Sequence, residues 1–331
     1  MDSRPNLKQW LWALVLLVVL PLQAAEPLPS WKQGTSRAAI VEFVDAVTRQ
    51  GNPDFVPAAQ RIAVFDNDGT LWSEQPMYFE VLFAFDEIKR MAPQHPEWKQ
   101  QQPYRAVLED DHQALAAAGM KGLMEIVGAT HTGLSTTQFT ANAKSWLAQA
   151  RHPTRHKRYT EMVYQPMLEL MAYLRANDFK VFIVSGGEVA FMRAFAEEVY
   201  GVPPEQVIGT TFVTRFQDQA GAPSIQRLAT LAHNDDGPGK PESIDSIIGR
   251  RPLLAFGNSD GDLQMLQWTM AGEGRRFAGL VHHTDAQREW AYDRKSNIGH
   301  LDQALDQARR DKWVVVDMAQ EWSGVYPGDH E

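Results

Sequence analysis

Five short apolar runs, each rich in branched or aromatic residues, mark the chain from its first quarter to its last. They are IAVF at 62–65, VFIV at 181–184, VIGT at 207–210, LLAF at 253–256 and FAGLV at 277–281. None alternates between apolar and polar residues as a half-exposed strand does. We therefore expect strands that are buried on both faces, as in a parallel sheet. A further run, WVVVDM from Trp313, predicts one more strand at the edge of that sheet.

Segments with helical spacing of apolar residues separate several of these runs. MLELMAYLRAND, from Met167, leads into the VFIV run, and VAFMRAFAEEVYG, from Val189, ends at Gly201, a typical C-cap residue. Strand and helix in repetition predict an α/β fold with a doubly wound parallel sheet, a Rossmann-like core. In such folds the ligand crevice lies at the carboxyl ends of the strands.

A long stretch without a strand pattern follows the first run. It contains three segments that are helical by period, EVLFAFDEIKRMA, HQALAAAGMKGLMEIVGA and TTQFTANAKSWLAQARH. An insertion of this size directly after the first strand predicts a helical cap over the crevice. Further along, two β-rich arms flank QAGAP within residues 211–229, and they predict a short surface hairpin.

The first residues have the pattern of a secretory signal. Arg4 and Lys8 precede the apolar run at 10–22, and QAAEP follows it. The run is shorter than the roughly 20 residues of a membrane span. We expect cleavage near Ala24 or Ala25 and a periplasmic or secreted product, with an uncleaved N-terminal anchor as the alternative.

These patterns divide the chain into three parts. They are a signal peptide at 1–25, an α/β core at 26–71 and 160–331, and a helical cap at 72–159.

Composition limits the partners of this protein. The 331 residues are 44% hydrophobic and 22% charged, which is typical of a globular chain. The net charge of -9 argues against binding of nucleic acid, which usually requires a basic surface. The chain has no cysteine, which excludes a lipoprotein anchor and a disulfide framework. We expect a small-molecule partner, no nucleic acid and no membrane contact after signal cleavage, while the oligomeric state is left open.

Polar groups fall where the predicted strands end. In chain order they are Asp66 and Asp68 after the first run, Ser185 and Gly186 after the second, Lys240 in the loop DDGPGKPES, and GNSDGD at 257–262 after the fourth. A single aspartate at a strand end is more often a helix cap or a turn residue. Strand ends of a parallel sheet share one edge, however, so the four groups together predict one common site.

The same four groups resemble the ordered motifs of the haloacid dehalogenase superfamily. DNDGT at 66–70, Ser185, Lys240 and the GNSDGD loop are similar to its four motifs, and the resemblance extends from about Arg61 to the end of the chain. It is nearest to the phosphatases, among them exported acid-phosphatase-like and phosphoserine-phosphatase-like hydrolases. HHTDAQREWAYDR at 282–294 is also similar to that exported group. The motifs are specific for the superfamily and not for a substrate.

The resemblance implies a Mg²⁺-dependent phosphomonoesterase that acts on a small phosphorylated metabolite. Asp66 would attack phosphorus and form an aspartyl-phosphate, which splits one difficult displacement into two easier ones. Asp68 would be the general acid for the leaving alcohol and then the base for water. The residues that would bind the phosphoryl oxygens, or brace the loop beside them, are Ser185, Gly186, Lys240 and Thr70.

The resemblance also implies a metal site with one departure from the family pattern. Asp66, the backbone carbonyl of Asp68, Asp262 and Asn258 would hold Mg²⁺. The fourth motif usually begins with Gly-Asp, but this chain has Asn258 at the acidic position. An amide oxygen can bind Mg²⁺ but brings no negative charge. We therefore expect weaker Mg²⁺ affinity, or tolerance of other divalent ions, with Asp260 as the alternative ligand.

Two other functions remain open from the sequence. The first is another reaction of the superfamily, either phosphoryl transfer or phosphonate cleavage. Phosphonate cleavage would need a Schiff-base lysine in the cap, and the candidates are Lys99, Lys121 and Lys144. A catalytically weak or inactive protein that binds a phosphorylated ligand is the other, and only Asn258 favours it. Glu74 is expected either to be a solvated flap residue or to contact a cationic substrate group. His282 and His283 are expected to have a structural role or to lie at the rim of the crevice.

Overall fold

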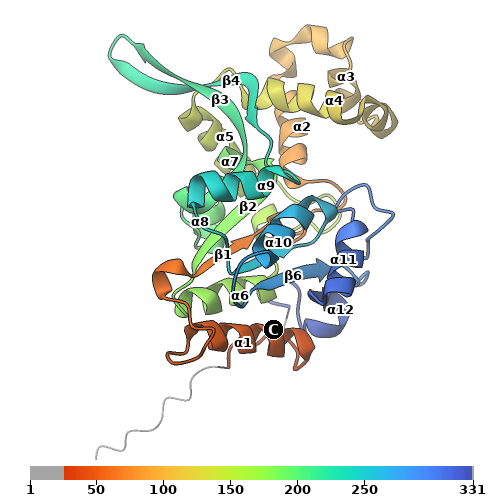
Figure 1. The fold of residues 1–331 in the computed structure, drawn as a ribbon. Helices are drawn as coiled ribbons and strands as arrows, with labels where there is room; N and C mark the ends of the chain where they lie inside the picture. The colour runs from red at the N-terminus through yellow and green to blue at the C-terminus, as the bar shows by residue number, and fades with distance from the viewer. Residues whose placement is uncertain (1–25, 330–331) are drawn as a thin grey trace, which may run out of the picture.

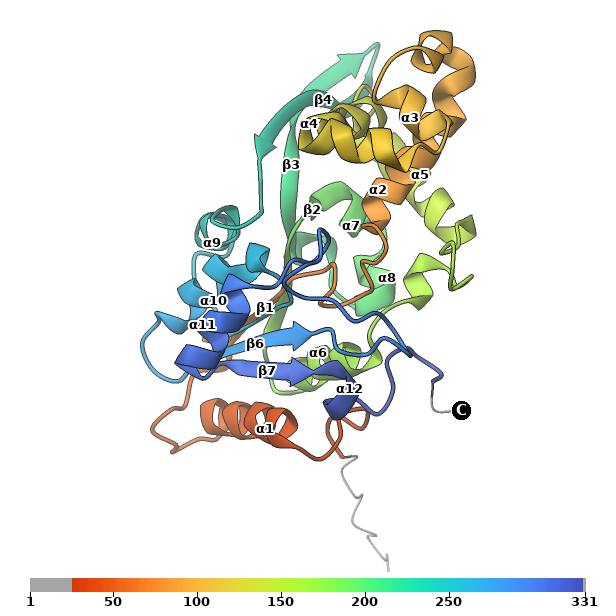
Figure 2. The same ribbon diagram turned by 90° about the vertical axis from the view of Figure 1, so that its right-hand side faces the viewer.

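The computed structural model describes residues 26–329, so the predicted signal peptide at 1–25 lies outside the described residues. Its centre is a seven-stranded sheet in the order β4-β3-β2-β1-β5-β6-β7. Figures 1 and 2 show this sheet between its helices. The strands are β1 (Ile62–Phe65), β2 (Lys180–Glu188), β3 (Val207–Gln219), β4 (Ala222–His233), β5 (Leu254–Gly257), β6 (Phe277–His282) and β7 (Val314–Asp317). All neighbours are parallel except β3 and β4. The predicted α/β fold and all six predicted strands are confirmed.

Helices cover both faces of this sheet. The flanking helices are α1 (Thr35–Thr48), α6 (Gln165–Ala176), α7 (Val189–Arg193), α8 (Ala196–Tyr200), α9 (Gly239–Ser243), α10 (Leu263–Met270), α11 (Gln303–Asp311) and α12 (Met318–Glu321). Ala63 and Phe65 of β1 pack in one apolar cluster with α1 and α6. Ile62 and Val64 pack in a second cluster with α10 and α11. Because successive residues of a strand point to opposite faces, β1 is buried on both sides, as its unbroken apolar run predicts.

Two segments differ from their predictions. Ser185 and Gly186 lie within β2 and not after it, because β2 continues to pair with β3 beyond Ser185. The register shifts between Ser185 and Glu188, so the Ser-Gly-Gly segment forms a bulge in the strand. The helix expected from Val189 is divided into α7 and α8, and it ends at Gly201, whose left-handed conformation matches the predicted C-cap.

Of the α-helices between β1 and β2 along the chain, all but α6 lie together at one end of the molecule, as Figure 1 shows. They are α2 (Phe79–Met91), α3 (Tyr104–Leu108), α4 (His112–His131) and α5 (Thr136–Gln149). The division of the chain into cap and core at 72 and 159 stays a prediction. Within residues 26–329, no helix combines the length and the apolar character that a membrane span requires.

The predicted hairpin is present as β3 and β4, and it is longer than expected. It also contacts the inserted helices. The Arg227 side chain of β4 donates a hydrogen bond to the His131 carbonyl oxygen at 2.6 Å, and its guanidinium lies 4.2 Å from the centre of the Phe139 ring. Because Arg227 is buried, the hairpin and the helices share one packed region beside the sheet.

We expect Phe256→Ala to lower the free energy of unfolding by about 3–5 kcal/mol, the usual cost of truncating a buried phenylalanine. Phe256 is fully buried in β5, and its ring stacks on Phe65 with centroids 5.9 Å apart. The control is Phe216→Ala, because Phe216 is 65% exposed on the hairpin and should change stability by less than about 0.5 kcal/mol. Urea denaturation of both variants measures the difference, and equal destabilisation would contradict the assigned core.

Candidate active site

The carboxyl ends of three neighbouring strands bring the predicted motifs together. Asp66 directly follows β1, Ser185 lies in the bulge of β2, and Asn258 directly follows β5. A cavity of about 480 Å³ opens at this edge of the sheet. The predicted site residues that line it are Asp66, Asp68, Ser185, Gly186 and Lys240. Thr70, Asn258 and Asp262 are buried near the same strand ends but do not line the cavity.

Lys240 joins two buried carboxylates. Its Nζ donates hydrogen bonds of 2.6 Å to Asp66 Oδ1 and to Asp262 Oδ1. The exposed fractions of Lys240 and Asp66 are only 2% and 6%. Burial alone lowers the pKa of the lysine, but the charges of Asp262 and Asp66 outweigh burial and raise it, so the ammonium form is retained. Lys240 therefore holds a permanent positive charge against the predicted nucleophile.

The two aspartates of the first motif differ in their electrostatic environment. Burial, together with the charge of Asp262, raises the pKa of Asp66 to about 8, although Lys240 opposes this shift. Burial also raises the pKa of Asp68, to about 6, while a hydrogen bond of 2.7 Å from Trp72 Nε1 lowers it. A carboxyl group with a pKa near neutrality can give a proton in one step and take one in the next. Burial therefore moves the pKa of Asp68 in the direction that suits a group that both gives and takes a proton.

Thr70 connects the loop that follows β1 (the β1 loop, from Asp66) to the loop that follows β5 (the β5 loop, from Asn258). Its hydroxyl donates a hydrogen bond of 3.1 Å to Asn258 Oδ1, and it lies 3.4 Å from Asp66 Oδ2. The side chain is fully buried. Thr70 therefore braces the two loops. It does not line the cavity, whereas Ser185, Gly186 and Lys240 do.

The two acids of the GNSDGD loop have other contacts. Asp262 Oδ2 accepts the backbone N–H groups of Asn258 and Ser259 at 2.9 and 3.1 Å, while Oδ1 faces Lys240. Asp260 accepts three backbone N–H groups at the start of α11, so it caps that helix. The geometry therefore favours Asn258 over Asp260 as the residue that faces the β1 loop.

Oxygen ligands for a divalent cation at this site must come from several kinds of group, namely carboxylate, amide and backbone carbonyl. Among residues 26–329, no group of three or more His, Cys, Asp or Glu side chains is arranged to hold a metal ion. Asp66 Oδ2 and the Asn258 amide oxygen both contact the Thr70 hydroxyl, at 3.4 and 3.1 Å. Carboxylate and amide oxygens, together with a backbone carbonyl such as that expected from Asp68, are the kinds of ligand that suit Mg²⁺. The residues present fit this ion.

Glu74 and His283 are both buried; burial agrees with a structural role for His283, but it differs from a solvated position for Glu74. Glu74 is 1% exposed, and it accepts hydrogen bonds from Asn258 Nδ2 and the Tyr292 hydroxyl. His283 lies beneath the β1 loop, with Nε2 2.7 Å from the Gly69 carbonyl oxygen. The expectation of a solvated Glu74 is wrong, because a segment far away in the chain covers it. The covering segment is HHTDAQREWAYDR at 282–294, whose similarity to exported relatives is the sequence feature that could have indicated a role near the site.

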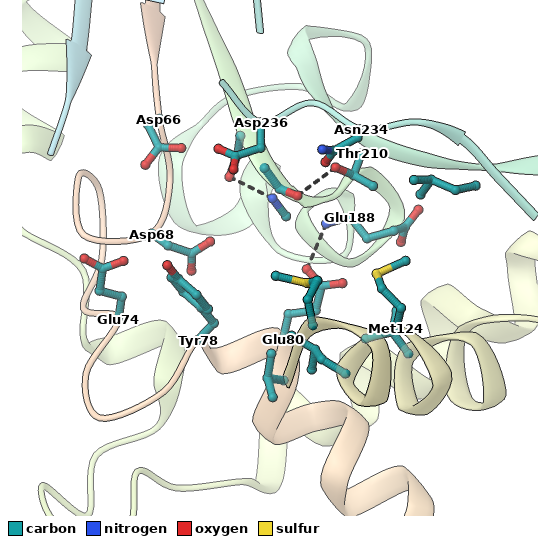
Figure 3. Close-up of a pocket in the computed structure, with 18 of the residues that line it drawn as sticks. Asp66, Asp68, Glu74, Tyr78, Glu80, Met124, Glu188, Thr210, Asn234 and Asp236 are labelled. Atoms are coloured by element: carbon teal, nitrogen blue, oxygen red, sulfur yellow. Dashed lines mark hydrogen bonds between the residues drawn. The ribbon is translucent and has the colours of Figure 1, made fainter. Parts of the chain in front are cut away.

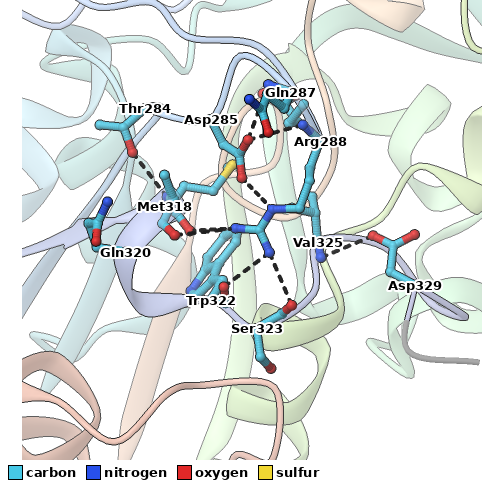
Figure 4. A network of polar contacts seen from close by, with 12 residues as sticks. Thr284, Asp285, Gln287, Arg288, Met318, Gln320, Trp322, Ser323, Val325 and Asp329 are labelled. Atoms are coloured by element: carbon cyan, nitrogen blue, oxygen red, sulfur yellow. Dashed lines mark hydrogen bonds and ion pairs between the residues drawn. The ribbon is translucent and has the colours of Figure 1, made fainter.

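The covering segment is held by a polar network close to the C-terminus, shown in Figure 4. Arg288 donates hydrogen bonds to the carbonyl oxygens of Trp322 and Ser323 at 3.1 and 3.0 Å, and it pairs with Asp285. The chain from 283 to 292 is therefore anchored at its middle, while its two ends reach the β1 loop.

The wall opposite Asp66 comes from the inserted helices and the hairpin. Figure 3 shows Met124 and Glu80 facing the cavity from these helices. Glu80 accepts a hydrogen bond of 2.8 Å from the Glu188 backbone N–H, and Glu188 pairs with the buried Arg227 at 3.2 Å. The cap lysines named above do not line the cavity, so a Schiff-base lysine is not placed at the site.

The fold and the site together define a class of protein. They are those of an α/β enzyme with a carboxylate pair and a buried lysine at the carboxyl edge of a parallel sheet. Residues 63–267 match the family model of the haloacid dehalogenase-like hydrolases. The chain belongs to this family, and it is a hydrolase of that kind.

Several solved structures are similar to this chain at low identity. One is a conserved functionally unknown protein from Anaerococcus prevotii DSM 20548, with 15% identity, a TM-score of 0.48, and coverage of 83% of this chain and 88% of that chain. A protein with unknown function from Bordetella pertussis Tohama I has 13% identity, a TM-score of 0.49, and coverage of 78% and 99%. A phosphoserine phosphohydrolase-like protein from Francisella tularensis subsp. tularensis SCHU S4 has 16% identity, a TM-score of 0.37, and coverage of 67% and 87%. The comparison with curated proteins gives no match.

We expect Lys240→Met to cost about 3–5 kcal/mol of stability in the presence of a chelator, because it leaves two buried carboxylates without their cation. Lys89→Met is the matched control. Lys89 also pairs with an aspartate, Asp110, at 2.6 Å, but that pair is solvent-exposed and its loss should cost less than about 1 kcal/mol. Urea unfolding curves measure both changes. Equal losses for the two lysines would refute the structural importance assigned to the buried pair.

Proposed function

We propose that this chain is a Mg²⁺-dependent phosphomonoesterase that hydrolyses small phosphate esters through an aspartyl-phosphate on Asp66. The observation that carries the proposal is the arrangement at the end of β1. Asp66 lies against Lys240 at 2.6 Å, and Asp68 lines the same cavity two residues later. Membership of the hydrolase family supports the same reading.

The first chemical step uses Asp66 and Asp68. A carboxylate oxygen of Asp66 forms a bond to phosphorus, while the bond between phosphorus and the ester oxygen breaks. The departing oxygen takes the proton of the Asp68 carboxyl group and leaves as the alcohol. Lys240 and Ser185 line the cavity beside Asp66, where they can bind the phosphoryl oxygens.

The second step returns the enzyme to its starting state. Asp68, now ionised, accepts a proton from water, and the water oxygen bonds to phosphorus. The bond between phosphorus and the Asp66 oxygen breaks, which releases inorganic phosphate and the free carboxylate. One residue therefore acts first as the acid and then as the base, and a pKa near neutrality suits both acts.

Asp66, Asn258 and the carbonyl of Asp68 are the groups that would hold Mg²⁺. Asp262, which the resemblance also implies as a ligand, accepts hydrogen bonds from Lys240 and from two backbone N–H groups, so we assign it to positioning the lysine. When bound, the ion neutralises charge on the phosphoryl group and so reduces its repulsion of an attacking carboxylate. The net negative lining of the cavity supports this requirement. Among the described residues that line it, Lys240 is the only cation, beside six carboxylates at Asp66, Asp68, Glu74, Glu80, Glu188 and Asp236.

The cavity also supports a limit on the substrate. A space of about 480 Å³ suits a small metabolite, and its outer wall includes the apolar side chains of Leu123, Met124 and Phe212. We propose a small phosphorylated metabolite as the partner, without nucleic acid. A periplasmic or secreted location, with no membrane contact after signal cleavage, is part of the proposal and depends on the N-terminal pattern alone.

We expect the chain from residue 26 onward to hydrolyse an aryl phosphate with Mg²⁺ and to lose this activity with a chelator. Asp66→Asn should remove turnover because the amide is a poor nucleophile, and Asp68→Asn should lower kcat roughly 10²–10⁴-fold through loss of proton transfer. Release of the aryl alcohol measures each rate.

The matched control for these substitutions is Asp236→Asn, which changes the charge of the same cavity at a residue that the mechanism does not use. It should keep most of the turnover. Metal-independent hydrolysis, or full activity of Asp66→Asn, would rule out the proposed chemistry. A folded protein that binds a phosphate ester without turnover would instead support the binding-protein alternative.

A further inference from the structure

Glu74 forms a direct contact with the amide that replaces an acid in the fourth motif. Its Oε1 accepts a hydrogen bond of 2.7 Å from Asn258 Nδ2, and both side chains are 1% exposed. The two residues are 184 positions apart in the chain. A buried carboxylate is costly unless its charge is used or compensated, so this placement calls for a reason.

The surrounding loops are shaped around this carboxylate. Gly69 and Gly299 both have left-handed backbone conformations, with φ of +71° and +63°. A Cβ at either glycine would collide with Glu74 Oε1, and a Cβ at Gly69 would also collide with the Asn258 amide. Only glycine satisfies both the conformation and the close approach. The two loops therefore form a cradle that fixes the Glu74 carboxylate.

A second donor holds the same oxygen. The Tyr292 hydroxyl donates a hydrogen bond of 2.8 Å to Glu74 Oε1. The Tyr292 ring stacks on His283 with centroids 4.3 Å apart, and His283 Nε2 lies 2.7 Å from the Gly69 carbonyl oxygen. Glu74 is therefore tied to the β1 loop through the segment 283–292, and it cannot move without disturbing that loop.

This contact determines which way the Asn258 amide points. A carboxylate only accepts hydrogen bonds, so the amide must present its NH₂ group to Glu74. Its oxygen is then directed to the opposite side, where it accepts the Thr70 hydroxyl at 3.1 Å beside Asp66 Oδ2. This is the side on which the carboxylate, amide and carbonyl oxygens can hold a cation. A hydrogen bond to a carboxylate also increases the electron density on the amide oxygen.

We propose that Glu74 and Asn258 act as a pair at the divalent-cation site. Asn258 supplies the oxygen ligand, and Glu74, as a positioning residue that acts through Asn258, fixes its orientation and supplies the negative charge that an aspartate would carry there. This inference rests on the proposed Mg²⁺-dependent function. It assigns a role to Glu74 different from contact with a cationic substrate.

The first test is calorimetric titration of the chain from residue 26 onward with Mg²⁺ alone, without substrate. Glu74→Gln keeps the shape and removes the charge, and it should weaken Mg²⁺ binding roughly 10–100-fold, as loss of a partner behind a metal ligand usually does. The matched control is Glu80→Gln. Glu80 lines the same cavity but contacts the Glu188 backbone and not Asn258, so its substitution should leave Mg²⁺ affinity unchanged.

The second test exchanges the charge between the two positions. Asn258→Asp alone sets two carboxylates against each other across the 2.7 Å contact, and it should lower the melting temperature of the metal-free protein. Combining Asn258→Asp with Glu74→Gln restores one charge and one donor–acceptor pair in reverse order. The double variant should bind Mg²⁺ more tightly than Glu74→Gln alone, because the charge now lies on the ligand itself.

The outcomes separate this inference from the function on which it rests. Equal Mg²⁺ affinity of the wild type and Glu74→Gln overturns the inference and leaves the proposed function intact. A double variant that binds no better than Glu74→Gln also overturns it, because a merely structural glutamate would not be rescued by moving its charge. A wild-type protein that binds no Mg²⁺ overturns both. Weak binding by Glu74→Gln with rescue in the double variant is the result that the pair predicts.

Discussion

The bridge from Lys240 to Asp66 and Asp262 is the interaction on which the rest of the site depends. It places one positive charge between two buried carboxylates from different strand ends, with hydrogen bonds of 2.6 Å to each. Such a bridge is stable only while all its members are present, since an unpaired buried charge is far more costly than an unpaired surface charge. It also joins the loop after β1 to the loop after β5, so the geometry of the crevice follows from it.

The bridge does not balance the local charge. Asp68 and Glu74 lie close by, and burial raises the pKa of each carboxyl group, that of Asp68 to about 6 and that of Glu74 well above its usual value. Acids that accumulate in this way at the end of a buried strand are stabilised by a cation or by protonation. The same concentration of acidic groups would favour a divalent ion, and that ion would in turn make the crevice suitable for a phosphoryl group.

The sequence predicted the parts of this arrangement that are local. Each apolar run could be recognised as a strand because a strand that is buried on both faces is apolar at every position. Asp66 and Asn258 could be placed because they directly follow such runs. Contacts between distant segments left no comparable mark. The sequence around Glu74 does not show its burial, because Tyr292, which helps to bury it, lies 218 positions away. The Ser185 bulge was likewise invisible, because it arises from the register between β2 and β3 and not from either strand alone.

The central claim is that Asp66 becomes phosphorylated during turnover, and the most direct measurement is mass analysis of the protein quenched in acid while it hydrolyses an aryl phosphate. The account predicts a mass increase equal to one phosphoryl group, located on the peptide that contains Asp66 and removed by mild base, as expected of an acyl phosphate. Turnover without any phosphorylated protein, or a phosphoryl group on a peptide that lacks Asp66, would contradict this claim.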